Sequence, residues 1–184
     1  LNGFLCNGGF MQITDSIRTL KGVGDKVEEK LNKLDIYTVE NDEKILANFN
    51  GAKSIKLCGF VTGPEFVELF KKSQVLVHTE SFDAYNVELT KNSISTKIAD
   101  CLASGIPLFA YGPECLASMG HLIRNDCAVV AVNKAQLKDA LYKMLNDVEL
   151  RREKAQKGLE VAKKCHCAET QSEKLRLIVK DECR

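Results

Sequence analysis

The chain has 184 residues, of which 45% are hydrophobic and 28% are charged, and its formal net charge is +1. These values are ordinary for one globular domain, and a near-neutral chain has no overall field that would recruit nucleic acid or an anionic membrane. No apolar run approaches the roughly 18 residues that a membrane-spanning helix needs, and no signal peptide is recognisable. The chain starts at Leu1 and not at Met, so the sequence leaves open that it is a fragment.

Residues 1–34 are predicted to form an atypical, mostly helical N-terminal segment. Turn signals at 2–3 and 7–9 flank a short apolar run at 4–6. Two apolar stripes with helical spacing follow, and Gly22-Val23-Gly24 lies between them and would interrupt a single helix. The stripes consist of Ile13, Ile17 and Leu20 before the glycines and of Val27, Leu31 and Leu34 after them.

This segment resembles a helix-hairpin-helix at residues 20–31, and residues 11–39 resemble the start of a branch-migration helicase of the RecG type. That resemblance implies backbone contacts to a nucleic-acid phosphate. However, residues 13–34 hold five basic and four acidic side chains, and the hairpin occurs once, so few phosphates could be neutralised. We therefore expect the segment to pack on the sheet, with DNA binding and a chimeric N-terminus as open alternatives.

From residue 35 onward the sequence predicts a Rossmann-like three-layer α/β/α domain, 35–184, with a mostly parallel sheet. Strands are predicted at 35–40, 54–60 and 74–79, because these runs are rich in apolar and β-branched residues. A helix is predicted from Pro64, with Phe66, Val67 and Phe70 on its apolar face. The run at 74–79 is nearly all apolar, as expected for a sheet that is covered on both faces.

An acidic loop, Glu80–Asp83, follows that buried strand directly, and 84–94 is predicted to be loop because it shows no clear period. His78 is interpreted as a core histidine. In open α/β sheets, ligands bind beyond the carboxyl ends of the strands. The loop from Glu80 is therefore a candidate binding segment.

The stretch 93–113 predicts a loop, a capped helix, a tight turn and a buried strand. Ser95 and Thr96 are residue types that cap helices, Gly105 stands where a left-handed residue ends a helix, and 108–111 is a short apolar strand. The helix start offers unpaired backbone N–H groups and a positive dipole end, to which Lys97 adds a charge. This is a candidate phosphate site, in which Asp100, one turn later, could reach ribose hydroxyls.

The same stretch resembles the donor-binding segment of GT-B glycosyltransferases of the family 4 type. That family has a Ser/Thr-Lys helix start, an acidic residue, a small Ala/Ser-Gly-x-Pro turn and an apolar strand. By this match Glu80 stands at the first acidic position of the family and Asp100 at the second. A literal Glu-x7-Glu, Glu80 to Glu88, also exists, but Glu88 does not precede the Gly-x-Pro turn. The resemblance covers roughly residues 35–180.

The resemblance implies one half of a GT-B enzyme, which binds a nucleoside-diphosphate sugar and needs an acceptor-binding partner domain for transfer. It implies Glu80 as the catalytic residue, neither metal nor cofactor, and an acceptor that the sequence does not identify. Gly8-Gly9 has no Arg or Lys beside it where the family has basic residues. We therefore expect no transfer by this chain alone, and a catalytically silent module is a further alternative. The implied donor-binding residues are Ser81, Phe82, Ser95, Thr96, Lys97 and Asp100.

After the stretch 93–113, the sequence predicts a short helix at 114–119, a strand at 127–132, an amphipathic helix around 137–145 and a charged helical stretch at 149–180. The eight cysteines mostly stand singly in apolar runs, which predicts reduced, buried thiols in a cytoplasmic protein. Cys165-His166-Cys167 suggests zinc, but neighbouring residues on a helix point about 100° apart and no second ligand pair is near.

Overall fold

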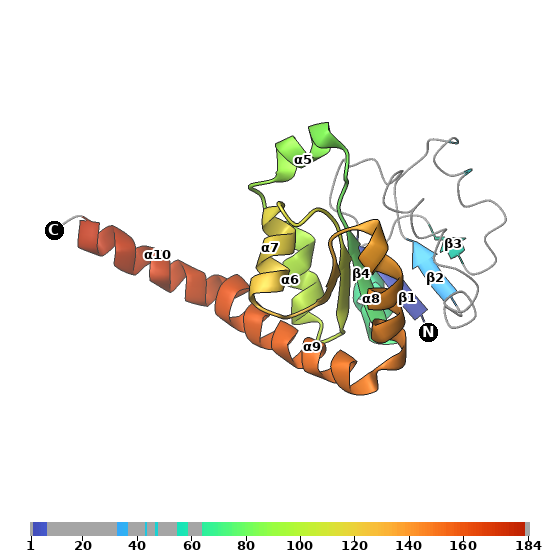
Figure 1. Cartoon of the computed structure of the whole chain (residues 1–184). Helices are drawn as coiled ribbons and strands as arrows, with labels where there is room; N and C mark the ends of the chain where they lie inside the picture. Colours follow the sequence, from blue (N-terminus) through green and yellow to red (C-terminus); the bar gives the residue numbers. More distant parts are fainter. Residues whose placement is uncertain are drawn as a thin grey trace.

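The computed structural model describes residues 2–6, 33–36, 55–58 and 64–182, together with the single positions Glu43 and Ala47. Figure 1 shows a sheet covered by helices, from which the last helix projects away from the body. The glycine hairpin at 22–24 and the turn at 7–9 lie outside the described residues, so their predicted roles remain predictions.

The described strands form one six-stranded sheet in the order β3-β2-β1-β4-β5-β6, and all neighbouring strands run parallel. This order is that of the doubly wound dinucleotide-binding fold, and it reverses between β1 and β4. The predicted Rossmann-like parallel sheet is thus confirmed. The strands are β1 (Asn2–Cys6), β2 (Lys33–Ile36), β3 (Ile55–Leu57), β4 (Val75–Thr79), β5 (Leu108–Tyr111) and β6 (Val129–Ala131).

The strand predictions from 54 onward agree with the structure to within three residues at each end. One earlier assignment is wrong: Leu34 belongs to β2 and not to a helical stripe. The sheet therefore takes strands from both sides of the predicted boundary at residue 34, since β1 pairs with β2 and with β4. The backbone at Leu34 is hydrogen-bonded to β1 on one side and to β3 on the other. This pairing outweighs the helical spacing of its side chain.

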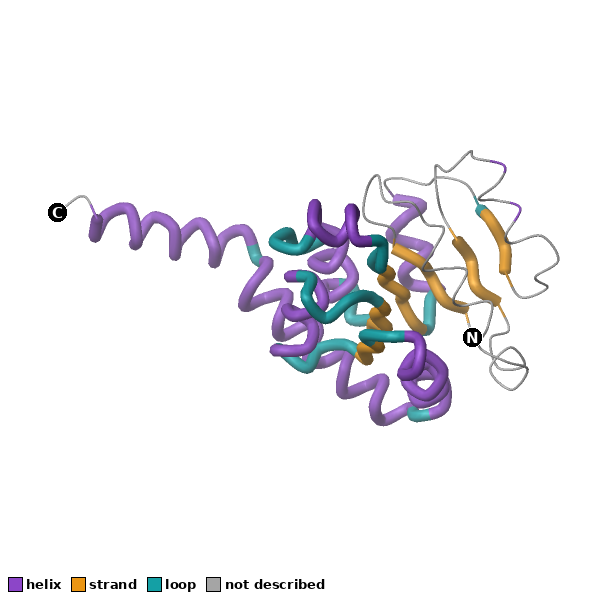
Figure 2. The backbone as a smooth tube through the Cα atoms, turned by 45° about the horizontal axis from the view of Figure 1, so that its top comes forward, coloured by secondary structure: helices purple, strands orange, loops and turns teal. Residues whose placement is uncertain are grey.

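The helices lie in two layers, one on each side of the sheet (Figures 1 and 2). Leu76 and Leu108 point to the same face and share a core cluster with Ile98 of α6 and Leu122 of α7. Helix α8 lies across the other face, against β5 and β6. The helices are α4 (Pro64–Lys72), α5 (Ala84–Thr90), α6 (Thr96–Ala103), α7 (Ala117–Arg124), α8 (Lys134–Asn146), α9 (Val148–Val161) and α10 (Ala168–Glu182).

Helix α6 and the turn after it follow the sequence prediction closely. Ile98, Cys101 and Leu102 are its buried residues, which is the predicted apolar face. Gly105 has φ +70°, the left-handed conformation expected at the helix end. A Cβ there would lie 3.4 Å from Leu159 of α9, so the backbone conformation, and not lack of space, explains the glycine.

The prediction of loop at 84–94 is wrong, because residues 84–90 form helix α5. Asp83 caps this helix: its side chain accepts a hydrogen bond of 3.1 Å from the backbone N–H of Asn86. No residue of α5 is buried, and Tyr85 and Leu89 are 72% and 65% exposed. A helix that buries no face has no apolar period, so its only sequence signal was the capping residue.

Two further details differ from the predictions. The short helix expected at 114–119 begins at Ala117 and continues to Arg124 as α7, because Leu116 is still extended at the N-cap position. In α4, Phe70 is buried as expected, but Val67 is 51% exposed.

The predicted charged C-terminal stretch is two helices joined by a π-helical turn, η2 (Ala162–His166), after which Cys167 is extended. One lysine, Lys154 of α9, is buried, and its ammonium donates to Asp126, after α7, at 2.5 Å from Oδ1 and 3.3 Å from the carbonyl. Hydrogen bonds from Lys154 and Lys157 hold the pKa of Asp126 below its usual value. The predicted charged stretch thus also anchors α9 to the rest of the domain.

Within the described part of the chain, the cysteines are free thiols, and Cys101 and Cys127 are buried. Burial raises the pKa of the Cys127 thiol to about 11, so it is an inert core residue. The described residues contain no group of three or more side chains that could hold a metal ion. None of the described helices is long and apolar enough to cross a membrane.

Two histidines join η2 to α7. The Nε2 atoms of His121 and His166 are 3.0 Å apart, and Asn125 Nδ2 lies 3.4 Å from His121 Nδ1. Burial lowers the pKa of both histidines, and for His121 the neighbouring His166 and Arg124 lower it further. A nitrogen pair at this distance holds one proton in an N–H···N bond, and a proton on both facing nitrogens would set two donors against each other.

We predict that acid weakens the fold through this pair. Because the folded pKa values lie below the ordinary value of about 6.5, the neutral forms are favoured by folding. The contribution of the pair to the free energy of unfolding should therefore be fully present above that pH. It should fall as the pH drops below it, towards the folded pKa values. Urea unfolding at pH 7.5 and pH 5.5 measures the loss, which should be smaller for His166→Gln. An equal loss in that variant would show that the pair is not responsible.

Candidate functional site

The candidate site lies at the edge of the sheet where β4 and β5 end. Because these strands are parallel neighbours, the chain leaves both at the same edge, and the backbone N–H of Glu80 donates to the Tyr111 carbonyl at 2.8 Å. The strand order reverses between β1 and β4, so Glu80 stands at the switch point, where ligands of this fold class bind. The predicted placement of Glu80 at a ligand edge is consistent with this geometry.

Glu80 is held in a close-fitting environment. It is 7% exposed, and its Oε1 lies 2.9 Å from Nε2 of His78, which is 1% exposed. A Cβ at position 112 would lie 2.6 Å from the Cβ of Glu80, a distance that real Cβ atoms do not show. Only glycine at 112 therefore leaves room for Glu80 in its present position.

The other residues of the acidic loop have different surroundings. Ser81 is 2% exposed and its Oγ accepts a hydrogen bond of 3.0 Å from the backbone N–H of Asp83. The Phe82 ring lies 4.9 Å from the Tyr111 ring and is partly exposed. Ser81 thus shapes the loop, whereas Phe82 presents part of an aromatic surface beside the edge.

The second candidate segment is the start of α6. Ser95 occupies the N-cap position, but its side chain makes no capping hydrogen bond, so the predicted side-chain cap is wrong. Its backbone N–H donates to Ser118 Oγ instead, at 3.0 Å. Thr96 and Asp100 are exposed and Lys97 is half-buried, so all three lie at the surface of the first turns.

The two segments meet at the start of α7. Ser118 donates from its Oγ to the Ser93 carbonyl at 3.3 Å and accepts from Ser95, which fixes the loop before α6. The next residue, Met119, has its sulfur 3.3 Å from where a Cβ of Gly112 would lie, beside Glu80. Consecutive residues of α7 therefore lie against the loop before α6 and against the turn at Gly112, which faces Glu80. Sequence reasoning gave Ser118 no role, because a serine in a short helix carries no distinctive signal.

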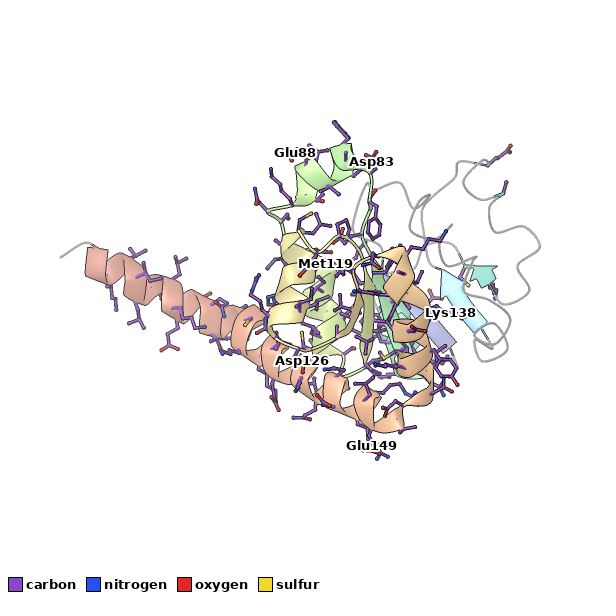
Figure 3. The ribbon with its side chains drawn as sticks, viewed as in Figure 1. Asp83, Glu88, Met119, Asp126, Lys138 and Glu149 are labelled. Atoms are coloured by element: carbon purple, nitrogen blue, oxygen red, sulfur yellow. The ribbon has the colours of Figure 1, made fainter. Side chains whose placement is uncertain are left out.

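The choice between the two acidic partners of Glu80 can be compared with the structure. Glu88 lies on α5, is strongly exposed and pairs with Lys91 at 2.6 Å (Figure 3). Asp100 lies one turn into α6, the helix whose start is tied to α7. Asp100 is exposed as well, so the preference for Asp100 over Glu88 remains a prediction.

Comparison with known proteins adds the family. A family model described as glycosyl transferase-like matches residues 20–176, which is most of the chain. The chain belongs to that family. The comparison with curated proteins gives no match.

Solved structures agree in fold with this family assignment. WaaG, a glycosyltransferase involved in lipopolysaccharide biosynthesis, matches with a TM-score of 0.65 and 14% identity over 88% of this chain and 42% of that one. Sucrose-phosphate synthase from Thermosynechococcus elongatus matches with a TM-score of 0.64 and 12% identity, over 98% of this chain and 45% of that one. The C-terminal CMP-Kdo binding domain of WaaA from Acinetobacter baumannii matches with a TM-score of 0.57 and 11% identity, over 87% of this chain and 88% of that one.

The chain spans less than half the length of the first two of these proteins and most of the third, which is a single domain. Together with the family match, this confirms the resemblance to the C-terminal domain of GT-B glycosyltransferases. The resemblance of residues 11–39 to a helicase start is not tested by these comparisons.

We predict that Gly112→Ala displaces Glu80. The added methyl group would collide with a buried side chain, and such overpacking typically costs about 1–3 kcal/mol of unfolding free energy. Urea unfolding measures this loss. Gly120→Ala is the matched control, because its Cβ would meet only the flexible end of Arg124, and alanine is favoured over glycine within a helix. If Gly112→Ala is as stable as Gly120→Ala, the close fit around Glu80 is wrong.

Proposed function

We propose that this chain is the donor-binding half of a glycosyltransferase, that it binds a nucleoside-diphosphate sugar, and that it transfers the sugar together with an acceptor-binding domain. The observation that carries the proposal is the position of Glu80. In this glycosyl transferase-like chain, the buried carboxylate of Glu80 lies at the switch point of the sheet. It faces Gly112, against which Met119 of α7 packs, and the preceding residue, Ser118, holds the loop before α6.

The diphosphate is assigned to the start of α6. Backbone N–H groups of the first turn are unpaired within a helix, and the dipole end is positive, which together favour a phosphate group. Thr96 contributes a hydroxyl and Lys97 a charge at the same end, while Ser95, tied to Ser118, fixes the loop. Asp100 is assigned to the ribose hydroxyls.

The sugar is assigned to Glu80, with Phe82 and the Ser81 loop beside it. Transfer is a displacement at the sugar carbon, in which a nucleoside diphosphate leaves. The protein must then stabilise the negative charge that develops on the leaving group, and fixed donors and cations serve that purpose. We assign this work to the start of α6 and Lys97, with neither metal nor cofactor.

The acceptor site is assigned to a partner domain, because the chain spans 42% of WaaG and 45% of sucrose-phosphate synthase. We expect this chain alone to bind donor without transferring sugar. The similar WaaA domain, described as CMP-Kdo binding, supports donor binding as a task that one domain of this fold performs. The buried free thiols Cys101 and Cys127 favour the cytoplasm, where thiols stay reduced.

The proposal predicts thermal stabilisation by nucleotides. A ligand that binds only the folded chain adds about 2.7 kcal/mol at 100 times its dissociation constant. UDP or GDP should therefore raise the unfolding midpoint of the 184-residue chain, whereas a short branched DNA at 150 mM salt should not. A shift with DNA alone would contradict the proposal and favour the hairpin at Gly22–Gly24.

A second prediction concerns the phosphate contact. Lys97→Ala should weaken binding of the preferred nucleoside diphosphate by ~1–3 kcal/mol, the scale of a hydrogen bond to a charged group. Lys138→Ala is the matched control, since Lys138 is an exposed lysine of α8 on the other face of the sheet (Figure 3). Isothermal titration of both variants decides, and equal affinities in the two would exclude Lys97 from the site.

A further inference from the structure

His78 and Glu80 form a buried pair on the same face of the sheet. The two side chains are two residues apart, so both project to the α6 and α7 side of the sheet. His78 is 1% exposed and Glu80 7%, and the nitrogen–oxygen distance is 2.9 Å. The family resemblance assigned a role to Glu80 and none to His78.

The protonation of this pair follows from its other nitrogen. In the described structure, His78 Nδ1 is buried without a hydrogen-bond partner. A proton on Nδ1 would be a buried donor without an acceptor, which is rare in proteins, whereas an unpaired acceptor is better tolerated. The proton therefore belongs on Nε2, where it is donated to a Glu80 carboxylate.

The remaining surroundings of Glu80 limit its movement. Its backbone N–H is held by the Tyr111 carbonyl, and its Cβ and Cγ lie against Gly112. The sulfur of Met119 lies 3.3 Å from the place that a Cβ of residue 112 would take. A carboxylate in this narrow space has few orientations available, and the hydrogen bond from His78 selects one of them.

We propose that His78 is a positioning residue for the donor sugar: its Nε2–H fixes the orientation of the Glu80 side chain, whose oxygens then accept hydrogen bonds from sugar hydroxyls. This inference rests on the proposed function of the site. His78 itself does not contact the ligand, since it lies in β4, below the edge.

The test compares sugar nucleotides with the bare nucleotides. Titration calorimetry of the 184-residue chain with UDP, UDP-glucose, GDP and GDP-mannose gives a ratio of dissociation constants with and without the sugar. In His78→Leu, which removes the donor, the advantage given by the sugar should fall by roughly tenfold, the effect of losing one hydrogen bond to a charged group. Affinity for the bare nucleotide should change less than twofold, because its phosphates bind elsewhere.

Two further variants separate positioning from stability. His78→Gln keeps an N–H donor near the same place and should retain most of the sugar advantage. His121→Gln removes another buried histidine, in α7, and should lower stability without changing the ratio. If His78→Leu only lowers the unfolding midpoint and keeps the parent ratio, His78 is structural and the inference is wrong.

Failure of the proposed function gives a different result. If the parent chain binds none of the four probes, the function fails and the inference fails with it. If the parent binds nucleotides with no sugar advantage, donor binding stands and Glu80 does not contact the sugar, so the inference alone is wrong.

A spectroscopic measurement tests the pair without any ligand. Nitrogen-15 spectra of the imidazole at pH 7 should show the Nε2–H tautomer for His78, and Glu80→Gln should shift the Nε2 signal. The Nδ1–H tautomer would overturn the inference, because Nε2 could then not donate to Glu80.

Discussion

The parallel pairing of β4 with β5 is the constraint on which the site depends. Parallel neighbours end at the same edge, so the loop after Thr79 and the turn after Tyr111 leave the sheet side by side. The pairing extends one residue further, through the hydrogen bond from Glu80 to Tyr111. Glu80 is thus fixed as if it were still part of the strand, although it is the first residue of the loop.

Position 112 shows how this arrangement limits the sequence. With Glu80 held over the end of β5, the residue opposite it must lack a side chain. The same closeness brings Met119 of α7 against the pair, and Ser118 next to it holds the start of α6. The start of α7 therefore lies close to both segments that the sequence singled out separately, although 11 residues lie between Thr96 and Leu108 and α7 follows only after them.

The elements that are buried against the core were predicted best from the sequence. The strands β4 and β5 are apolar runs, and α6 combines an apolar face with a glycine end, so these elements were found with their ends. Helix α5 was missed because none of its residues is fully buried, and Leu34 was misplaced because its helical spacing was accidental. Glu80 and the start of α6 were named from the sequence as candidates, and their roles remain predictions. The contact of Glu80 with His78 was not predicted, because residues two apart interact in this way only if the extended strand continues to the second.

Charge separates the two tasks within the proposed site. The sequence left open whether Glu80 meets the sugar or lies near a phosphate. Two like unit charges 4 Å apart repel by about 4 kcal/mol at an effective dielectric constant of 20. Glu80 is buried, so its carboxylate, when ionised, would oppose a phosphate beside it by about that much. The start of α6, with its dipole and Lys97, attracts the same phosphate. The proposed arrangement, with the diphosphate at α6 and the sugar hydroxyls, which are uncharged donors, at Glu80, therefore avoids this repulsion.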